Sequence, residues 1–244
     1  MRTIVVGDVH GCRVELEALL DRLAFACGDR LVFVGDLIAR GPDSLGVLDL
    51  VRRTGAVVVR GNHEQKLLEW RAARNAWLHR SAAAKPPMGR IHRDLARALR
   101  PIDWSVLETT PLFADFPDHG MRVVHAGVRP GTRFEDQAPE TLTRIRTVPS
   151  PAAGRRKGEQ VLWGSIYEGP PQMVFGHNAA PGLQLHPWAT GLDTGCVYGG
   201  RLTALVLQHG QRIPRSVAAR RDLLVSEPAR RMWFTPASHH PPVA

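Results

Sequence analysis

The stretch Thr-Ile-Val-Val-Gly-Asp-Val-His-Gly, residues 3–11, is a short apolar run followed by two residues that can bind a metal ion. Such runs, rich in β-branched residues and bounded by glycine, are typical of buried strands. Ligands of open α/β sheets bind beyond the carboxyl ends of the strands. Four later runs are built in the same way, and they end in Asp36, in Asn62 and His63, in His125 and in His177. The sequence therefore predicts an α/β fold with one convergent site.

Each of these residues has a simpler interpretation when it is taken alone. A Gly-Asp pair after a strand is usually part of a turn, and a single histidine there is more often a hydrogen-bonded structural residue than a ligand. The joint occurrence favours a metal site, because five such motifs follow one another along the chain: Gly-Asp-Val-His-Gly, Gly-Asp-Leu, Gly-Asn-His-Glu, His-Ala-Gly and Gly-His-Asn.

The candidate ligands are two carboxylates, one amide oxygen and three imidazoles, namely Asp8, His10, Asp36, Asn62, His125 and His177. This set is too large for one tetrahedral zinc ion, and it suits two metal ions ~3.5–4 Å apart, as in hydrolytic phosphate chemistry. Asp36 is the expected bridge, because it lies between the two ligand groups in the chain. Asp8 and His10 would complete one site with it, and the other three residues would complete the second. Mixed oxygen and nitrogen ligands suit manganese, iron, zinc, cobalt or nickel, and manganese is the working choice.

The order and composition of these motifs resemble those of the calcineurin-like metallophosphoesterases and, within them, the phosphoprotein-phosphatase superfamily. Residues 35–44, Thr143–Arg146 and residues 192–203 are similar to motifs of the bacterial symmetrical diadenosine tetraphosphatases, and the resemblance covers about residues 1–208. It implies an α/β fold of two packed mixed β-sheets flanked by helices. It also implies a binuclear-metal phosphohydrolase that cleaves nucleoside polyphosphates such as diadenosine tetraphosphate by attack of a metal-bound water or hydroxide.

The resemblance further implies roles for four residues outside the ligand set. His63 would be the general acid that protonates the leaving oxygen, and Arg40 would hold phosphate oxygens with its planar fork of donors. Arg144 and Arg146 are candidates for the same role, since residues two apart on a strand point to the same side. The simpler interpretation of each arginine is an ordinary surface residue. Protein phosphatases have an aspartate at the position of Ala39 that orients the catalytic histidine, so His63 must be oriented by another group or work without one, and the sequence identifies no substitute.

Other functions compete with this hypothesis. A phosphoserine/threonine protein phosphatase would have the same fold, tetraphosphate caps on RNA would offer the same chemistry, and a basic nucleic-acid-binding protein could carry a decayed site. Ala39 and the Thr-Arg-Ile-Arg motif at Thr143–Arg146 favour nucleoside polyphosphates, and the complete ligand set argues against decay. One departure from the dinucleotide hydrolases is the shorter stretch Val128–Leu142 between two of the motifs.

The expected domain organisation is one metallophosphoesterase domain over residues 1–215 with a helical insert over about residues 64–110. Within the insert, helices are predicted over Glu64–Trp77 and Ile91–Leu99, because the prolines between them stop a helix. Two insert tryptophans that are seven residues apart, Trp70 and Trp77, share one helix face, for core packing or for base stacking. Residues 216–244 are expected to be a basic extension, with a helix near residues 217–225 and a disordered end. The Pro- and Gly-rich stretch 149–158 is expected to be a mobile loop.

Composition narrows the partners and the location. The 244-residue chain has a formal net charge of +9, which favours anionic partners such as polyphosphates, nucleic acids or acidic peptides. No run of eighteen apolar residues is present, so no membrane span is expected. The first predicted strand begins at about Thr3 and leaves no room for a signal peptide. Three cysteines without metal-binding spacing fit the cytoplasm.

Overall fold

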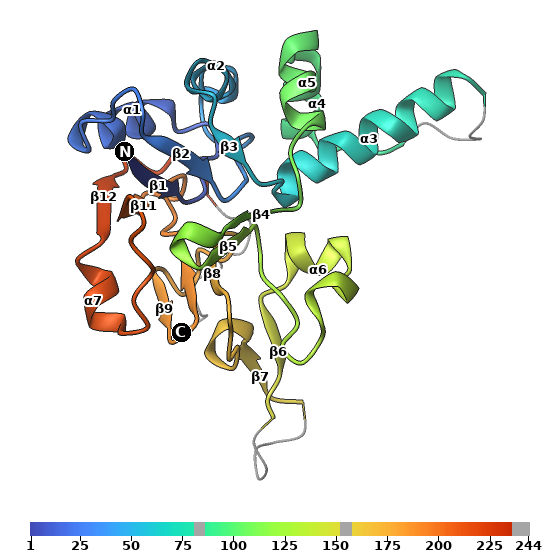
Figure 1. Cartoon of the computed structure of the whole chain (residues 1–244). Coiled ribbons are helices and arrows are strands. Elements are labelled where there is room, and N and C mark those ends of the chain that lie inside the picture. The colour runs from blue at the N-terminus through green and yellow to red at the C-terminus, as the bar shows by residue number, and fades with distance from the viewer. Residues whose placement is uncertain (81–85, 152–157, 236–244) are drawn as a thin grey trace, which may run out of the picture.

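The computed structural model describes residues 1–80, 86–151 and 158–235, and in it two β-sheets pack face to face with helices on their outer sides (Figure 1). The helices are α1 (Arg13–Arg22), α2 (Ser44–Thr54), α3 (Asn62–Leu78), α4 (Arg90–Ala98), α5 (Pro101–Glu108), α6 (Pro139–Arg144) and α7 (Val217–Arg221). The strands are β1 (Arg2–Val6), β2 (Arg30–Phe33), β3 (Val57–Val58), β4 (Phe113–Phe116), β5 (Met121–Val124), β6 (Thr147–Pro149), β7 (Gln160–Leu162), β8 (Gln172–Phe175), β9 (Gln184–His186), β10 (Ala189–Gly191), β11 (Arg201–Gln208) and β12 (Leu224–Pro228). The expected fold class, an α/β fold of two mixed sheets, is confirmed.

The first sheet has the strand order β12-β11-β1-β2-β3. Its strands β1, β2 and β3 are parallel, whereas β11 and β12 are antiparallel to their neighbours. Successive side chains of a strand face opposite sides of the sheet. In β1, Ile4 and Val6 accordingly pack in the core beneath the helices, with Leu16 of α1 and Leu48 of α2, while Val5 packs in the core between the two sheets.

The second sheet has the strand order β4-β5-β8-β10-β9. Its central strands β5, β8 and β10 are parallel, and the two edge strands are antiparallel to them. Val123 and Val174 face the first sheet, whereas Val124 and Phe175 face the outer core around Trp163. The parallel strands of both sheets end at the same side of the molecule, which is where the predicted ligands follow them.

The predicted secondary structure agrees with these elements in its main points. The five predicted strands are confirmed as β1, β2, β3, β5 and β8, and the two predicted helices of the insert are confirmed as α3 and α4. Helix α5 was not predicted, although its sequence carries the signals. Pro101 stands in its first turn, and the Asp103 carboxylate accepts from the Arg100 backbone N–H at 2.9 Å. No helix in the described part of the chain is both long and apolar enough to cross a membrane.

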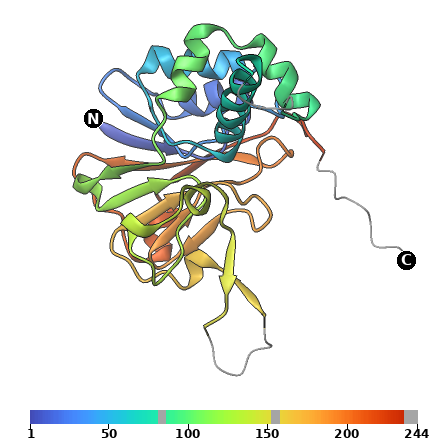
Figure 2. The same cartoon turned by 90° about the vertical axis from the view of Figure 1, so that its right-hand side faces the viewer.

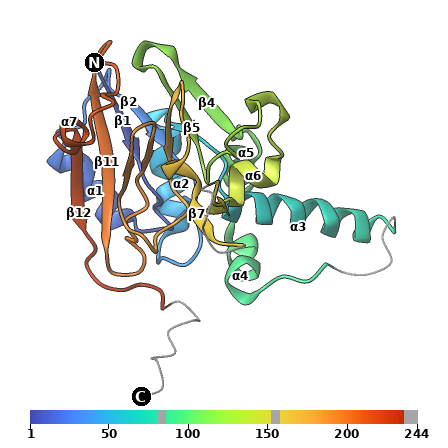
Figure 3. The same ribbon diagram turned by 90° about the horizontal axis from the view of Figure 1, so that it is seen from below.

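Two segments stand out from the body of the molecule. Helix α3 begins beside β3 and runs outward, and α4 and α5 return beside its first half (Figures 1 and 3). Strands β6 and β7 form a separate hairpin that extends from the second sheet (Figure 2). The predicted mobile loop falls mostly at the end of this hairpin, where residues 152–157 lie outside the described residues.

The segment after residue 215 differs from its prediction. The predicted helix ends early, at Arg221, and Leu224–Pro228 form β12, which pairs with β11 at the edge of the first sheet. The Arg220 side chain is fully buried and donates to Thr190 Oγ1 of β10 at 2.8 Å. Hydrogen bonds of β12 and contacts of α7 therefore hold part of the expected extension against both sheets. The division of the chain at residue 215 stays a prediction, and residues 236–244 lie outside the described residues.

Candidate active site

The six predicted ligands gather at the carboxyl ends of five strands. Asp8 and His10 follow β1, Asp36 follows β2, Asn62 begins α3 after β3, His125 follows β5 and His177 follows β8. All of these side chains are buried except that of Asn62, which is partly exposed. Compact groups of possible ligand atoms occur here twice, as His10, Asp36 and His63 and as Asp36, His125 and His177, and the atoms of each group lie within 4.8 Å of one another.

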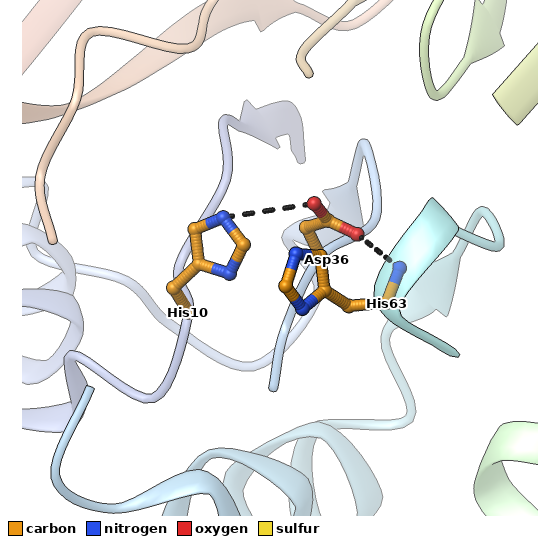
Figure 4. A group of neighbouring side chains, drawn as sticks. All are labelled: His10, Asp36 and His63. Atoms are coloured by element: carbon orange, nitrogen blue, oxygen red, sulfur yellow. Dashed lines mark hydrogen bonds and ion pairs between the residues drawn. The ribbon is translucent and has the colours of Figure 1, made fainter. Parts of the chain in front are cut away.

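Asp36 is the residue that the two groups share. Its Oδ2 atom lies 3.6 Å from His10 Nε2 and 3.5 Å from His125 Nε2, so it stands between the two imidazoles. Its Oδ1 atom accepts a hydrogen bond of 2.9 Å from the His63 backbone N–H (Figure 4). This position, between both groups and fixed by the backbone, suits the bridging role that its place in the chain predicts.

Hydrogen bonds to backbone carbonyls orient the three imidazoles of the ligand set. His10 Nδ1 donates to Ile38 O at 3.1 Å, and His125 Nδ1 donates to Val34 O at 2.9 Å. In a neutral imidazole, the other ring nitrogen then carries a free lone pair. His177 is turned the other way, because its Nε2 donates to Arg144 O at 3.1 Å and leaves Nδ1 as the free nitrogen.

The lone pairs of His125 and His177 converge on one point, whereas that of His10 faces Arg40 Nη1. Asn62 Oδ1, an acceptor, lies 3.0 Å from His125 Nε2 and 2.8 Å from His177 Nδ1, and both nitrogens are unprotonated in the neutral tautomers just described. Asp36 Oδ2 faces the same His125 nitrogen. The two imidazole nitrogens and the Asn62 oxygen are three acceptors without a hydrogen atom between them, so they repel one another, whereas a divalent cation would bind them together with Asp36. The residues therefore fit a metal ion at this point.

The charge state of the site supports the same fit. Burial, the largest cause, lowers the pKa of His10 to about 3, of His125 to about 4 and of His177 to about 2, so these imidazoles are neutral, as metal ligands must be. Burial also raises the pKa of Asp36 to about 7. The pKa of Asp8 is raised well above its usual range by burial and by the nearby charge of Asp193. Divalent cations would offset the burial of these carboxylates.

Asp8 is held differently from the other ligands. It belongs to neither compact group, and both of its carboxylate oxygens accept from the His177 backbone N–H, at 3.1 and 3.0 Å. Gly176 has no room for a side chain, because a Cβ atom there would collide with Asp8 Oδ1. The close approach of the chain after β8 to Asp8 therefore requires this glycine. The assignment of Asp8 as a metal ligand stays a prediction.

The backbone around the site is unusual. Five non-glycine residues here have positive φ angles, between 48° and 70°, namely His10, Asp36, Ala39, Arg40 and His177. L-residues adopt this left-handed region at a cost, and such conformations persist where the surrounding structure holds them in place. Strained backbone at these five residues therefore sets the directions of the side chains that follow the strands.

Glu64 is a site residue that sequence reasoning missed. It is fully buried, its Oε2 atom accepts from the backbone N–H groups of Asp36 and Gly61, and its Oε1 atom accepts from that of Leu37, each at 2.9 Å. The carboxylate thereby ties the first turn of α3 to the backbone of Asp36. Its signal was present in the Gly-Asn-His-Glu motif, where only the two preceding residues received a role.

A cavity of about 660 Å³ opens beside the predicted ligands. Asp36, Asn62 and His177 form part of its wall, and Arg40 and Arg146 bring positive charge to it. Arg40 Nη1 lies 2.9 Å from His10 Nε2, and its guanidinium carbon lies over the rings of Tyr198 and Phe234, at 5.5 and 5.7 Å from their centroids. Two aromatic rings therefore support this arginine beside the ligands.

The structure does not bring Arg144 and Arg146 side by side. Arg144 is the last residue of α6, Ile145 has an extended backbone, and β6 begins only at Thr147, so the two arginines do not share a strand. Arg146 lines the main cavity, whereas Arg144 lines another one with Gln65 and Glu140. The prediction of one pair facing the substrate from a strand is wrong, because the end of a helix falls between them.

His63 has a partner that sequence reasoning did not find. Its Nδ1 atom lies 3.0 Å from Nε2 of His92 on α4, and the two rings stack at a centroid distance of 4.9 Å. On its other side the His63 ring meets the edge of His10 at 4.8 Å. Burial and the charges of neighbouring groups lower the pKa of His63.

The fold and this ligand set define a class of protein. Residues 1–200 match the family model described as calcineurin-like phosphoesterase, so the chain belongs to that family and is a phosphoric ester or anhydride hydrolase. The resemblance seen in the sequence is thereby confirmed.

Particular relatives agree with this assignment. An asymmetrical bis(5'-nucleosyl)-tetraphosphatase of Halalkalibacterium halodurans is 31% identical in an alignment of 225 positions, gaps included, that covers 84% of this chain and 89% of the relative. A symmetrical bis(5'-nucleosyl)-tetraphosphatase of Chromohalobacter salexigens is 33% identical in an alignment of 273 positions, gaps included, that covers 86% of this chain and 96% of the relative. The crystal structure of a candidate diadenosine tetraphosphatase is 35% identical, superposes with a TM-score of 0.73 and covers 93% of both chains.

Proposed function

We propose that the protein hydrolyses nucleoside polyphosphates such as diadenosine tetraphosphate with the help of two divalent metal ions. The observation that carries the proposal is the convergence of the unprotonated His125 and His177 nitrogens and the Asn62 oxygen on Asp36, beside a cavity that Arg40 and Arg146 make basic. The tetraphosphatase relatives support this substrate class, because the similarity extends over more than four fifths of the chain.

Two groups of residues would hold the metal ions. Asp8, His10 and Asp36 would bind one ion, and Asp36, Asn62, His125 and His177 would bind the other. When bound, the ions supply Lewis-acid charge and lower the pKa of a coordinated water. Manganese remains the proposed metal, with iron, zinc, cobalt and nickel as the other ions that suit mixed nitrogen and oxygen ligands.

The remaining site residues would bind the phosphates and move a proton. Arg40 and Arg146 would bind phosphate oxygens from the wall of the cavity, and the two aromatic rings beneath Arg40 would hold its guanidinium plane in place. Arg144, in the adjacent cavity, could reach only a more distant part of the substrate. His63 would act as general acid and give the proton on Nε2 to the leaving oxygen, because its Nδ1 is engaged by His92.

The insert offers a second basic cavity, of about 310 Å³, for the distal nucleoside. Its wall contains two tryptophans and four arginines, namely Trp70, Trp104, Arg71, Arg74, Arg93 and Arg97. Trp70 lies seven residues beyond His63 on α3, which is about 10 Å along the helix axis. Bases stack on aromatic faces and phosphates pair with arginine, so this composition suits a nucleotide.

The test compares two substrates with manganese present. We expect kcat/KM for diadenosine tetraphosphate to exceed that for a phosphoserine peptide, and to fall more steeply with added salt, because more charges are paired. A higher kcat/KM for the phosphopeptide would replace this proposal by a protein phosphatase. A higher value for tetraphosphate-capped RNA would extend it to RNA ends. The products, two ADP or ATP and AMP, would identify symmetrical or asymmetrical cleavage. The proposed location is the cytoplasm, where three free cysteines are stable.

A further inference from the structure

We propose that His92 is the positioning residue of His63, in the role for which Ala39 supplies no carboxylate. The inference rests on the proposed function of His63 as general acid, and it concerns how that imidazole is held. Ala39 itself cannot do this, because its side chain is a single methyl group. Its backbone N–H is engaged by Ser44 Oγ at 3.0 Å.

The contact between the two histidines is direct and well formed. His92 Nε2 and His63 Nδ1 are 3.0 Å apart, and the ring planes lie within 27° of each other. Either nitrogen can carry the shared hydrogen. If His63 Nδ1 donates, a cationic His63 also carries a proton on Nε2. If His92 Nε2 donates, a neutral His63 must have its only proton on Nε2. Both arrangements fix the ring, but only the first can deliver a proton from Nε2, because a neutral His63 that gave up its only proton would have to become an imidazolate.

The burial of His92 indicates that α4 is docked for this contact. His92 is only 7% exposed and is the one buried residue of α4. Leu95 and Ala96, on the same side of the helix, are partly buried against the core beneath the helices, while Ile91 and Arg93 are exposed. Because His92 is the one buried residue of α4, its contact with His63 is the most specific interaction that this helix makes with the site.

The charges around His92 keep it in the form that can accept. Burial is the largest cause that lowers its pKa, to about 4, and the positive charges of Lys66 on α3 and of Arg40 add to the effect. A neutral His92 holds the ring of His63 through a hydrogen bond without bringing a negative charge to the site. His92 touches none of the predicted metal ligands in the contacts of the described residues, so its replacement should leave metal binding intact.

The experiment uses three full-length variants: His92→Ala, His92→Gln and Ile91→Ala. Ile91 is the matched control, because it precedes His92 on the same helix and is exposed. The substrates are aryl phosphate esters whose phenol leaving groups have increasing pKa values, and their turnover is measured with manganese present. We expect His92→Ala to lower kcat about tenfold on the poorest leaving group, to change the best one little, and to leave KM and metal content unchanged. Gln, whose amide can hydrogen-bond to His63, should restore part of the loss, and Ile91→Ala should match the wild type.

Two further measurements separate positioning from a general structural effect. In a His63→Asn background, His92→Ala should cause no additional loss, because it acts only through His63. In metal-free protein labelled with ¹⁵N-histidine, His92→Ala should shift the Nδ1 resonance of His63 while the resonances of His125 stay in place. An additive loss in the double variant, an equal loss on all leaving groups or an unchanged His63 resonance would overturn the proposal. Because the esters carry no nucleotide, this outcome is independent of whether diadenosine tetraphosphate is the preferred substrate.

Discussion

The strand ends and the helical insert make different contributions to the same site. The strand ends hold five of the six predicted metal ligands, which are buried; several of these have left-handed backbone, and backbone carbonyl groups such as those of Ile38 and Val34 orient their imidazoles. The insert, α3 to α5, contributes His63 at its base, His92 and a basic cavity. The comparison teaches that most predicted metal ligands come from the strand ends, whereas the residues proposed for proton delivery, and one predicted ligand at the first residue of α3, Asn62, come from the helical insert. Variants of the two parts should therefore fail in different ways.

The largest effect is expected at the strand ends, from Asp36→Asn. The change weakens a ligand that both metal ions would share, so activity should fall by more than the roughly 10²–10⁴-fold typical of losing a general acid. Metal analysis and turnover of diadenosine tetraphosphate would measure it. Full activity with at most one tightly bound ion would contradict the bridging role.

His63→Asn, at the base of the insert, should separate the two parts most clearly. We expect metal content to stay near that of the wild type while kcat falls by about 10²–10⁴-fold on poor leaving groups. Aryl esters with good leaving groups need little protonation and should lose less. An equal loss across the leaving-group series would argue against His63 as the acid.

Glu64→Gln tests the connection between the two parts. The carboxylate accepts three backbone N–H groups, and an amide nitrogen in its place would face one of them as a second donor. We expect manganese affinity to fall about 10–100-fold, which is the range for residues that hydrogen-bond to a metal ligand without binding the metal themselves. Titration calorimetry measures this, and Glu69→Gln on the exposed side of α3 is the control. Unchanged affinity would show that Glu64 stabilises only α3.

Replacing Arg93 and Arg97 by alanine tests the outer part of the insert. Both side chains are exposed, and exposed ion pairs contribute roughly 0.2–1 kcal/mol each, so KM for diadenosine tetraphosphate should rise several-fold. KM for a small aryl phosphate should stay the same. If both substrates respond alike, the insert cavity does not hold the distal nucleotide.

The smallest expected signal is the proton released when manganese binds to metal-free protein. Burial raises the pKa of Asp36 to about 7, so at pH 6 this carboxyl is mostly protonated and must lose its proton to become a ligand. At pH 8 it is already ionised. Release should therefore fall as the pH rises from 6 to 8, and the imidazoles, neutral throughout, should add little. Calorimetry in buffers of different ionisation enthalpy counts the protons. Undiminished release from Asp36→Asn would assign it to other groups.

The two parts also differ in how far the sequence could predict them. Asp8, His10, Asp36, His125 and His177 each follow a strand, so the local pattern predicted the strand, which is confirmed, together with the candidate ligand after it. His92 lies 29 residues from His63, and a helical sequence does not say which side will be buried or against what. Tertiary docking of α4 decides this contact.

Two predictions of secondary structure are wrong, each for its own reason. The Thr-Arg-Ile-Arg motif was expected to be extended, but a proline at the start of α6 begins a short helix that ends within the motif. Strand β12 was missed because its Leu-Val-Ser-Glu-Pro sequence stands among basic residues that favoured a helical tail. Its pairing with β11 depends on a partner strand that no local pattern reveals.

The aromatic support of Arg40 has a consequence for biosynthesis. Every predicted ligand has been translated once the ribosome passes His177, yet Phe234, one of the two rings beneath Arg40, is added more than fifty codons later. The Trp233 indole and the Arg230 backbone N–H also donate to Glu15 on α1, at 2.7 and 3.0 Å. A nascent chain therefore contains all six predicted metal ligands before it contains the ring that supports Arg40, so we expect metal affinity to appear earlier in synthesis than the aromatic support of Arg40.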